Sequence, residues 1–261
     1  MDEIYLQGDT ARLIGRLRER LQEMTAAVQA LTGMAAGDSK AKEYLGVLNR
    51  GLCTQLRLIR RLELDRRLNS RDEIRLDRTT VDLAELCRSV AERADALTAP
   101  LLDIRVTCSA PPSLSAIADR GALEELLLGF ITNSVQAIGR SGSICLALER
   151  QEDRAVFTVT DSGGGMDPEV LAGLFDPQEE PETPARGLLL ARRIAELHGG
   201  TLVAGNAEQA GARVAVSIPL VERLGGILQS PGIRVDEGGW DPALVALSDC
   251  LPLRAFLPGQ R

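Results

Sequence analysis

Apolar residues recur with a helical period along the first part of the chain. Two sets of such positions are separated by the segment GMAAGDSK, residues 33–40, which contains two glycines and an Asp-Ser pair typical of a helix N-terminus. The first set is Leu13, Leu17, Leu21, Met24, Val28 and Leu31, and the second is Leu45, Leu48, Leu52, Leu56 and Ile59. Steps of three and four residues place each set on one face of a helix. We therefore expect an antiparallel helical hairpin over residues 1–70.

A single hairpin leaves a long apolar surface, here called the seam, exposed to solvent. Pairing with a second copy of the chain into a four-helix bundle would bury this seam, so we expect residues 1–70 to form a dimerisation domain. The alternative is that the hairpin packs on the domain that follows it.

The pattern changes after the polar segment NSRDEIRLDRTT, residues 69–80, which is typical of a linker. Helical periodicity is found in residues 81–97, 121–138 and 188–200. Strand-like alternation is found in residues 103–109, 114–119, 143–150, 154–161, 201–206 and 212–220. Helices and hairpin strands alternate without strict βαβ order. This order predicts an α+β fold, in which residues 71–220 form an α/β sandwich with helices on one face of a mixed sheet. Residues 221–261 form a C-terminal extension that could be an added strand, a packed clasp or a partner-binding segment.

Composition narrows the classes of function. The 261 residues are 44% apolar but only 3% aromatic, and the net charge is −7. Nucleic-acid binding is disfavoured because the chain has no basic stripe. The five cysteines are scattered and form no Cys-x-x-Cys pair, which argues against a disulfide framework or a zinc site and for a reducing compartment. With no run of 18 apolar residues, we expect no membrane span and a cytoplasmic protein.

Two segments carry candidate ligand-binding chemistry. In TDSGGGM, residues 160–166, Asp161 follows a strand and precedes three glycines. Its carboxylate can accept a hydrogen bond from the amino group of adenine, and Gly163 and Gly165 let the backbone approach a bound base. The alternative is an ordinary hairpin turn. Asn133 lies within a strongly apolar helix, and its amide oxygen is a suitable ligand for Mg²⁺, although a capping or surface asparagine would have the same sequence signature.

Four motifs in order, NSVQA, DSGGGM, LFDP and GLLLARRIAELHGG, resemble the ATP-binding domain of bacterial sensor histidine kinases. That domain belongs to a superfamily that includes DNA gyrase B, Hsp90 and MutL. The resemblance covers roughly residues 75–220, and the first two helices look like the dimerisation and phosphoacceptor hairpin of the same kinases. It implies ATP and Mg²⁺ as cofactors. The implied ATP-binding residues are Asn133, which bridges the magnesium ion, and Asp161, Gly163, Gly165, Met166, Gly187 and Leu188.

The chain departs from the family pattern at several positions. Thr183 and Ala185 stand where the first two glycines of the phosphate loop are expected, and the lid over residues 177–186 has three prolines and three glutamates. The only histidine is His198, at the end of a predicted helix. Gln22 occupies the position that the resemblance assigns to the phosphoacceptor, and an amide nitrogen is a very poor nucleophile. Gly129 leaves no visible general base in the asparagine helix, where Glu124 and Glu125 are expected on the solvent face.

These features predict a dimeric, histidine-kinase-like ATP-binding protein of two-component signalling that regulates by binding and does not autophosphorylate. The expected partners are a second copy of the chain and either a response regulator or a partner kinase. Two alternatives stay open. One is an active ATP-dependent kinase that phosphorylates a partner in trans, and the other is a dimeric scaffold without nucleotide.

Overall fold

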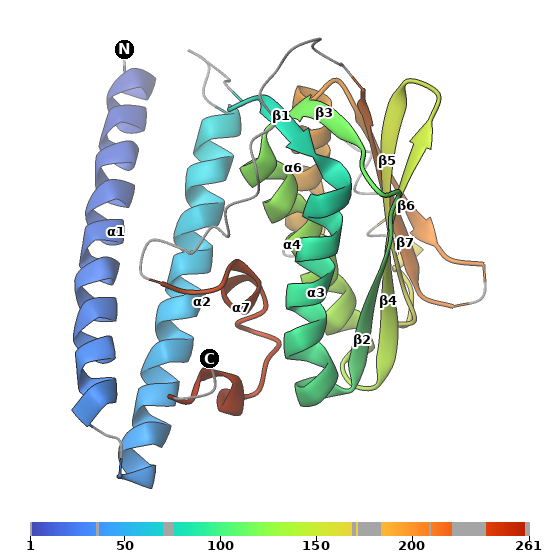
Figure 1. Ribbon diagram of the computed structural model, residues 1–261. Coiled ribbons are helices and arrows are strands. Elements are labelled where there is room, and N and C mark those ends of the chain that lie inside the picture. Colours follow the sequence, from blue (N-terminus) through green and yellow to red (C-terminus); the bar gives the residue numbers. More distant parts are fainter. Residues whose placement is uncertain are drawn as a thin grey trace. The chain divides into compact units, whose positions relative to one another are not determined.

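The computed structural model divides the chain into two compact units, which are taken one at a time below (Figure 1). One unit combines residues 1–74 with residues 233–261, and the other comprises residues 75–232. The residues that the structure describes are 2–34, 37–69, 76–168, 171, 184–208, 210–220 and 239–258. No helix in these ranges has the length and apolar character that a membrane crossing requires.

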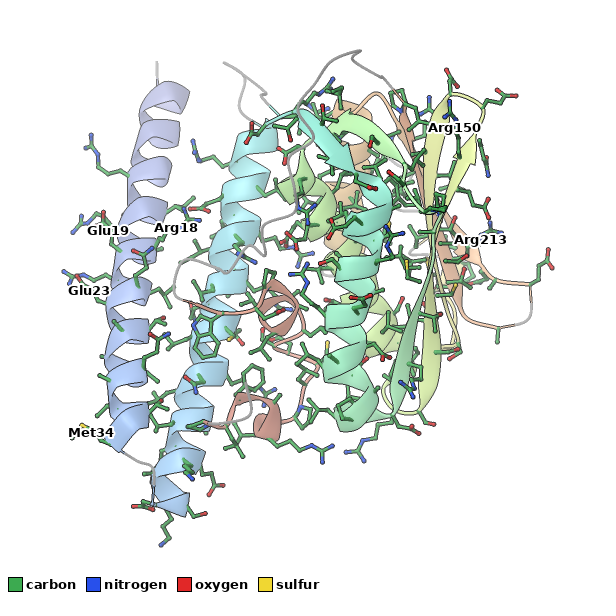
Figure 2. The ribbon with its side chains drawn as sticks, in the orientation of Figure 1. Arg18, Glu19, Glu23, Met34, Arg150 and Arg213 are labelled. Carbon is green, nitrogen blue, oxygen red and sulfur yellow. The ribbon has the colours of Figure 1, made fainter. Side chains whose placement is uncertain are left out.

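The first unit contains the predicted helical hairpin. Helix α1 spans Asp2–Met34 and α2 spans Ser39–Asn69. Asp38 caps α2, because its Oδ1 accepts hydrogen bonds from the backbone N–H groups of Lys40 and Ala41 at 2.9 and 3.2 Å. Arg18 lies on the side of α1 that faces α2 and pairs with Glu63 at 2.5 Å, whereas Glu19 and Glu23 point to the opposite side (Figure 2).

The apolar stripes of the hairpin divide between two faces. The buried residues include Ile14, Leu21, Thr25 and Val28 of α1 and Leu45, Leu52, Leu56 and Ile59 of α2. A neighbouring stripe stays exposed, and it consists of Leu13, Leu17, Met24 and Leu31 together with Tyr44, Leu48, Leu58 and Leu62. The apolar face predicted for α1 therefore includes both buried and exposed residues. The apolar part of this helix is wider than the strip that is buried.

The described C-terminal residues 239–258, here called the clasp, pack on α2 within the same unit. They form helix α7, Pro242–Ala246, and the short 3-10 helix η1, Leu253–Phe256. The side chain of Asn49 in α2 donates a hydrogen bond to the carbonyl oxygen of Phe256 at 2.9 Å, and Arg57 forms an ion pair with Asp249. Gly46 lies directly against Leu257, whose Cδ2 would be 2.9 Å from a Cβ at this position.

The second unit is built on a five-stranded mixed sheet with the order β2-β4-β5-β7-β6. The strands are β2 Ile104–Ser109, β4 Gly142–Gln151, β5 Arg154–Asp161, β6 Thr201–Asn206 and β7 Ala212–Pro219. Only the β2–β4 pair is parallel, and the other three pairs are antiparallel. A separate antiparallel ribbon joins β1, Thr79–Asp82, to β3, Ser115–Ala118. Residues 79–80 were expected in the linker but form a strand, because Thr79 and Thr80 pair with Ala118 and Ile117.

Three helices cover one face of this sheet (Figure 1). They are α3 Leu83–Leu102, α4 Arg120–Ile138 and α6 Pro184–Leu197. The sheet turns alternate residues toward them, including Ile144, Phe157 and Val216, all at most 1% exposed. The opposite face carries exposed side chains such as Cys145 and Val203. The helix-on-sheet architecture predicted from the sequence is therefore confirmed.

Candidate functional site

Helix α4, the end of β5 and the start of α6 enclose a cavity of ≈ 360 Å³ in the second unit. This volume is within the range of roughly 300–1,000 Å³ that is typical of small-molecule sites. Its lining residues are Phe130, Asn133, Ser134, Gln136, Ala137, Val159, Asp161, Gly165, Met166, Asp167, Leu188, Ala212 and Val214. Five of the residues singled out in the sequence are among them, namely Asn133, Asp161, Gly165, Met166 and Leu188. Residues up to 55 positions apart along the chain, Asn133 and Leu188, thus share one site.

Asp161 is the most firmly held polar group of this cavity. Asp161 is only 6% exposed. Oδ1 accepts hydrogen bonds from the backbone N–H groups of Gly163 at 2.9 Å and Ala212 at 3.1 Å. Oδ2 accepts a hydrogen bond from the hydroxyl of Ser134 at 2.9 Å. These donors supply the hydrogen bonds that a buried carboxylate requires, and they leave lone pairs on Oδ2 for a ligand.

The glycine turn behind Asp161 passes close to two other segments. A Cβ on Gly163 would be 3.1 Å from the backbone of Ala137 in α4. Gly165 has φ +82°, and a Cβ there would be 2.8 Å from Oδ1 of Asn206. Positive φ strains residues other than glycine. Residue 165 therefore requires glycine both for its backbone conformation and because a side chain would collide with Asn206. Gly163 itself is not among the residues that line the cavity. Its backbone N–H instead donates a hydrogen bond to the carboxylate of Asp161.

Asn206, at the end of β6, fixes the residue that follows the turn. Its Oδ1 accepts a hydrogen bond from the N–H of Met166 at 2.6 Å, and its Nδ2 donates one to the Met166 carbonyl oxygen at 3.3 Å. This pair of bonds holds Met166 at the cavity wall by its backbone, which leaves its side chain free to pack against a ligand.

Asn133 is half-buried and lines the same cavity from α4. Among the described residues no group of three or more His, Cys, Asp or Glu side chains could hold a metal ion by itself. Of the lining residues in the described part of the chain, Asp161 and Asp167 carry a charge, and both are acidic. A magnesium ion here would therefore take one or two oxygen ligands from the protein and the rest from a phosphate ligand and water, which is the usual arrangement for Mg²⁺.

The segment predicted as the phosphate loop and lid is described only in part. Leu188 is 4% exposed and lines the cavity, whereas Gly187 is half-buried and is not among the lining residues. Residues 177–183 of the predicted lid, including Thr183, lie outside the described part of the chain. Residues 184–186 belong to the first turn of α6, so the helix that carries Leu188 begins within the segment predicted as the lid.

His198 has a structural position, as the sequence predicts. It follows α6 and precedes Gly199, which has φ +77°. The imidazole Nε2 accepts a hydrogen bond from the backbone N–H of Asp119 at 3.0 Å, which assigns the proton to Nδ1, 2.8 Å from the carbonyl oxygen of Ile194. Burial lowers the pKa of His198. Nε2 thus joins the end of α6 to the N-terminus of α4, and the bond from Nδ1 to α6 orients the ring.

Three contributors to the site had no clear sequence signal. Ser134 looks like a neutral helix residue, Asn206 like a strand end and Gly211 like a turn residue. Gly211 has φ +88°, and a Cβ there would overlap the backbone of Asp161. Their roles depend on contacts with the turn at Asp161, 27 to 50 residues away, which no local pattern encodes. The assignment of Glu124 to the solvent face was wrong: it is 8% exposed and pairs with Arg93 at 2.5 Å, because α3 packs against this side of α4.

Comparison with known proteins finds similarity to an ATPase family within the second unit. Residues 118–222 match the family described as histidine kinase-, DNA gyrase B-, and HSP90-like ATPase. Sensor histidine kinase ZraS of Salmonella typhimurium is 36% identical over 125 residues, which cover 46% of this chain and 27% of ZraS. Sensor protein ChvG of Agrobacterium fabrum is 28% identical over 256 residues, 80% of this chain and 43% of ChvG. The chain spans about a quarter of the length of the ZraS relatives it matches.

A solved structure shares the fold over most of the chain. Full-length ShkA, in complex with AMPPNP, superposes with a TM-score of 0.65 over 83% of this chain and 46% of its own, at 23% identity. At this level of identity the similarity establishes the fold.

Proposed function

The chain carries a histidine kinase-, DNA gyrase B- and HSP90-like ATPase domain and is a homologue of sensor histidine kinases, and from this premise we propose that the cavity beside Asp161 binds ATP. One observation supports this above all. Asn133 and Asp161 line the same cavity, and the glycine turn forms part of its wall. In this arrangement Oδ2 of Asp161 accepts a hydrogen bond from the exocyclic amino group of adenine, and Met166 packs against the base.

Magnesium enters this site with the nucleotide. The amide oxygen of Asn133 is the neutral oxygen ligand that the cavity offers for it, and the ion neutralises phosphate charge in a site whose charged lining residues, in the part of the chain described, are carboxylates. Recognition of the base is assigned to Asp161, whose hydrogen bonds with Ser134 and Gly163 do not involve Asn133.

Calorimetry with Mg-ATP tests the site directly. We expect binding to the wild type and loss of at least about tenfold in affinity for Asp161→Ala, which removes the acceptor for the adenine amino group. Asp153→Ala is a matched control, because it removes a carboxylate from the β4–β5 turn of the same unit. Failure of the wild type to bind millimolar Mg-ATP would favour the nucleotide-free scaffold.

The domain acts, in this proposal, as a regulator that does not autophosphorylate on histidine. The single histidine, His198, is 4% exposed and uses both ring nitrogens in structural hydrogen bonds. Gln22, at the position assigned to the phosphoacceptor, has no nucleophilic nitrogen. A response regulator or a partner kinase is the expected binding partner. ThkA, whose structure with response regulator TrrA shares the fold at a TM-score of 0.54 and 21% identity, illustrates such an assembly.

Labelled ATP separates this proposal from an active kinase. The wild-type chain is expected to acquire no acid-labile phosphate, and Gln22→His provides a matched protein in which an imidazole stands at the acceptor position. Transfer of label to a purified response regulator or another partner protein would instead support kinase activity in trans.

The hairpin is proposed to form the dimer. Leu13, Leu17, Met24 and Leu31 are between 49% and 57% exposed and succeed one another on α1 at intervals of four and seven residues. Such a stripe is suited to a second pair of helices in a four-helix bundle. Because these four side chains are already about half buried, their remaining burial contributes roughly half of the 1.5–3 kcal/mol of a full burial each, on the order of 3–6 kcal/mol per chain before association costs.

A further inference from the structure

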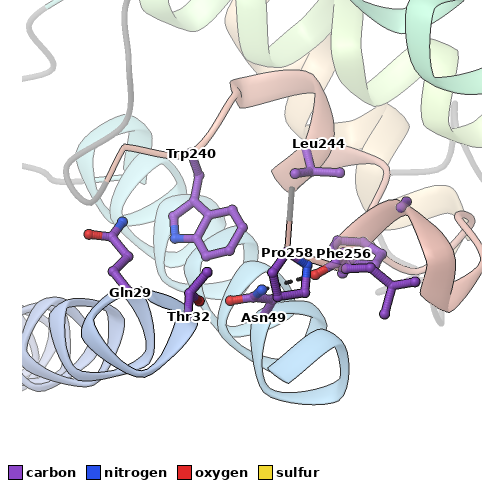
Figure 3. A pocket seen from close by; sticks show the side chains of 9 residues that line it. Gln29, Thr32, Asn49, Trp240, Leu244, Phe256 and Pro258 are labelled. Atoms are coloured by element: carbon purple, nitrogen blue, oxygen red, sulfur yellow. Dashed lines mark hydrogen bonds between the residues drawn. The ribbon is translucent and has the colours of Figure 1, made fainter. Parts of the chain in front are cut away.

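A second cavity lies within the unit formed by the hairpin and the clasp (Figure 3). Its volume is ≈ 130 Å³, and its walls come from α1, α2 and the clasp, three segments that are distant in sequence. The lining residues are Gln29, Thr32, Asn49, Trp240, Leu244, Ala255, Phe256, Leu257 and Pro258. The proposed nucleotide function leaves this cavity without a role.

The walls of this cavity are mainly apolar and aromatic. Trp240 and Phe256 are each 2% exposed and Leu244 is 7% exposed, so these side chains belong to the core of the unit. None of the nine described lining residues carries a charge, which selects a neutral ligand. An apolar cavity of roughly 150 Å³ is large enough for a benzene-sized molecule. The size of the cavity therefore matches a single aromatic ring.

One edge of the cavity offers hydrogen-bond acceptors. Asn49 is only 6% exposed, and its Nδ2 is used by the carbonyl oxygen of Phe256. Figure 3 shows the amide oxygen of Asn49 directed away from Phe256, toward Thr32 and Trp240. The hydroxyl of Thr32 donates its proton to the carbonyl oxygen of Val28 at 2.9 Å, so toward the cavity it also presents lone pairs. The amide oxygen of Asn49 can therefore accept a hydrogen bond from a ligand in the cavity.

We propose that this cavity is a binding site for a small neutral aromatic molecule that carries one O–H or N–H donor. The ring packs against Trp240, Leu244 and Phe256, and the donor bonds to Oδ1 of Asn49. A ligand in this position contacts both hairpin helices and the clasp, so its binding stabilises the clasp on α2. The site is independent of the ATP cavity, which belongs to the other unit.

Phenol and toluene are matched probes for this proposal, because they have nearly the same shape and differ in the hydroxyl group. Trp240 is the only tryptophan of the chain, so its fluorescence reports on this cavity alone. We expect saturable changes in Trp240 emission with both probes and an affinity for phenol about three- to tenfold higher, the value of one added hydrogen bond. No saturable change with either probe, or equal affinities for the two, overturns the proposal.

Two variants test whether the change in Trp240 emission comes from binding in this cavity. Thr32→Val keeps the shape of the side chain and removes the other acceptor at the polar edge, so the preference for phenol over toluene, which the proposal assigns to Oδ1 of Asn49, is expected to stay unchanged. Loss of that preference in this variant overturns the assignment to Asn49. Ala255→Met fills the space and is expected to abolish both signals. Thermal unfolding followed by circular dichroism checks that each variant is folded. An unchanged phenol signal in a folded Ala255→Met variant shows that phenol binds elsewhere, which also overturns the proposal.

Discussion

Individual residues of the candidate site are held by specific hydrogen-bonding neighbours, which come from three separate segments of the chain. Asp161 illustrates this, because its carboxylate receives hydrogen bonds from Ser134, Gly163 and Ala212. Two of these donors are fixed backbone groups on Oδ1, whereas the hydroxyl of Ser134 alone orients Oδ2. Since Oδ2 is the oxygen proposed to meet the amino group of adenine, Ser134 is a positioning residue for base recognition.

Substitution of Ser134 should therefore change base selectivity more than folding. For Ser134→Ala we expect ATP affinity to fall by about three- to tenfold, with a reduced preference for ATP over ITP, which carries an oxo group in place of the amino group. Ser134→Thr keeps the hydroxyl and should preserve that preference. Calorimetric titration of the three proteins with both nucleotides measures the ratio. An identical ATP-to-ITP ratio in all three would show that Ser134 has no positioning role.

His198 gives the second unit a defined dependence on pH. Burial lowers its pKa in the folded protein below the ordinary value of 6.5, so between these two pKa values the unfolded chain binds more protons than the folded one. The free energy of unfolding is fully retained above pH 6.5 and is lost as pH falls below it, with a maximum slope of about 1.4 kcal/mol per pH unit. Denaturant unfolding of the wild type and His198→Gln from pH 7.5 to 5.5 should show this slope only in the wild type. Parallel pH profiles for the two proteins would contradict this assignment.

At the scale of elements, the hairpin carries more apolar surface than its two helices bury against each other. Ile14, Leu21 and Val28 form the internal seam, while Leu13 and Leu17 stay exposed one step away on α1. The two stripes are interleaved in sequence, and helical geometry separates them by a rotation of about 100° per residue. The exposed stripe is the surface that the proposed dimer would bury.

A charge in this exposed stripe should dissociate the dimer. Leu17→Glu places two like charges in the proposed interface, and we expect the dissociation constant to rise by at least about tenfold. Ala26→Glu adds the same charge at an exposed position of α1 outside the stripe and should leave the dimer intact. Sedimentation equilibrium of both variants measures the constants. Equal effects of the two substitutions would exclude the stripe as the interface.

At the scale of the whole molecule, the two units report on ligands separately. Trp240, the only tryptophan, belongs to the unit of the hairpin and clasp, whereas the proposed ATP cavity belongs to the unit of residues 75–232. A ligand stabilises the folded state that binds it by RT ln(1 + [L]/Kd), about 2.7 kcal/mol at 100 times Kd. Each ligand should therefore act first on its own unit.

Thermal unfolding with Mg-ATP tests this separation. We expect ATP to move the transition seen by far-ultraviolet circular dichroism, which follows both units, and to leave the midpoint of the Trp240 fluorescence transition unchanged. Asp161→Ala serves as the control in which neither signal responds. A shift of the Trp240 transition equal to that of the dichroism signal would show that the two units unfold as one.

The elements of the fold were largely predictable from local pattern. Strand β5 follows the predicted boundaries of residues 154–161, and the predicted strand 201–206 is β6. Alternation and helical period depend on nearby residues only, so they are visible in a single sequence. The boundary of the linker was not predictable, because Thr79 and Thr80 become a strand only by pairing with Ile117 and Ala118.

Of the candidate site, the sequence by itself determined the motif residues Asn133, Asp161, Gly165, Met166 and Leu188, because their chemistry and spacing are local properties. Only the tertiary structure decided that these residues share one cavity, that Ser134, Asn206 and Gly211 support it, and that Glu124 pairs with Arg93. The same holds for the cavity under Trp240, whose walls lie up to 229 residues apart. Contacts between residues distant in sequence are set by the packing of helices on the sheet and of the clasp on α2. That packing produces no periodic pattern in the sequence from which these contacts could be predicted.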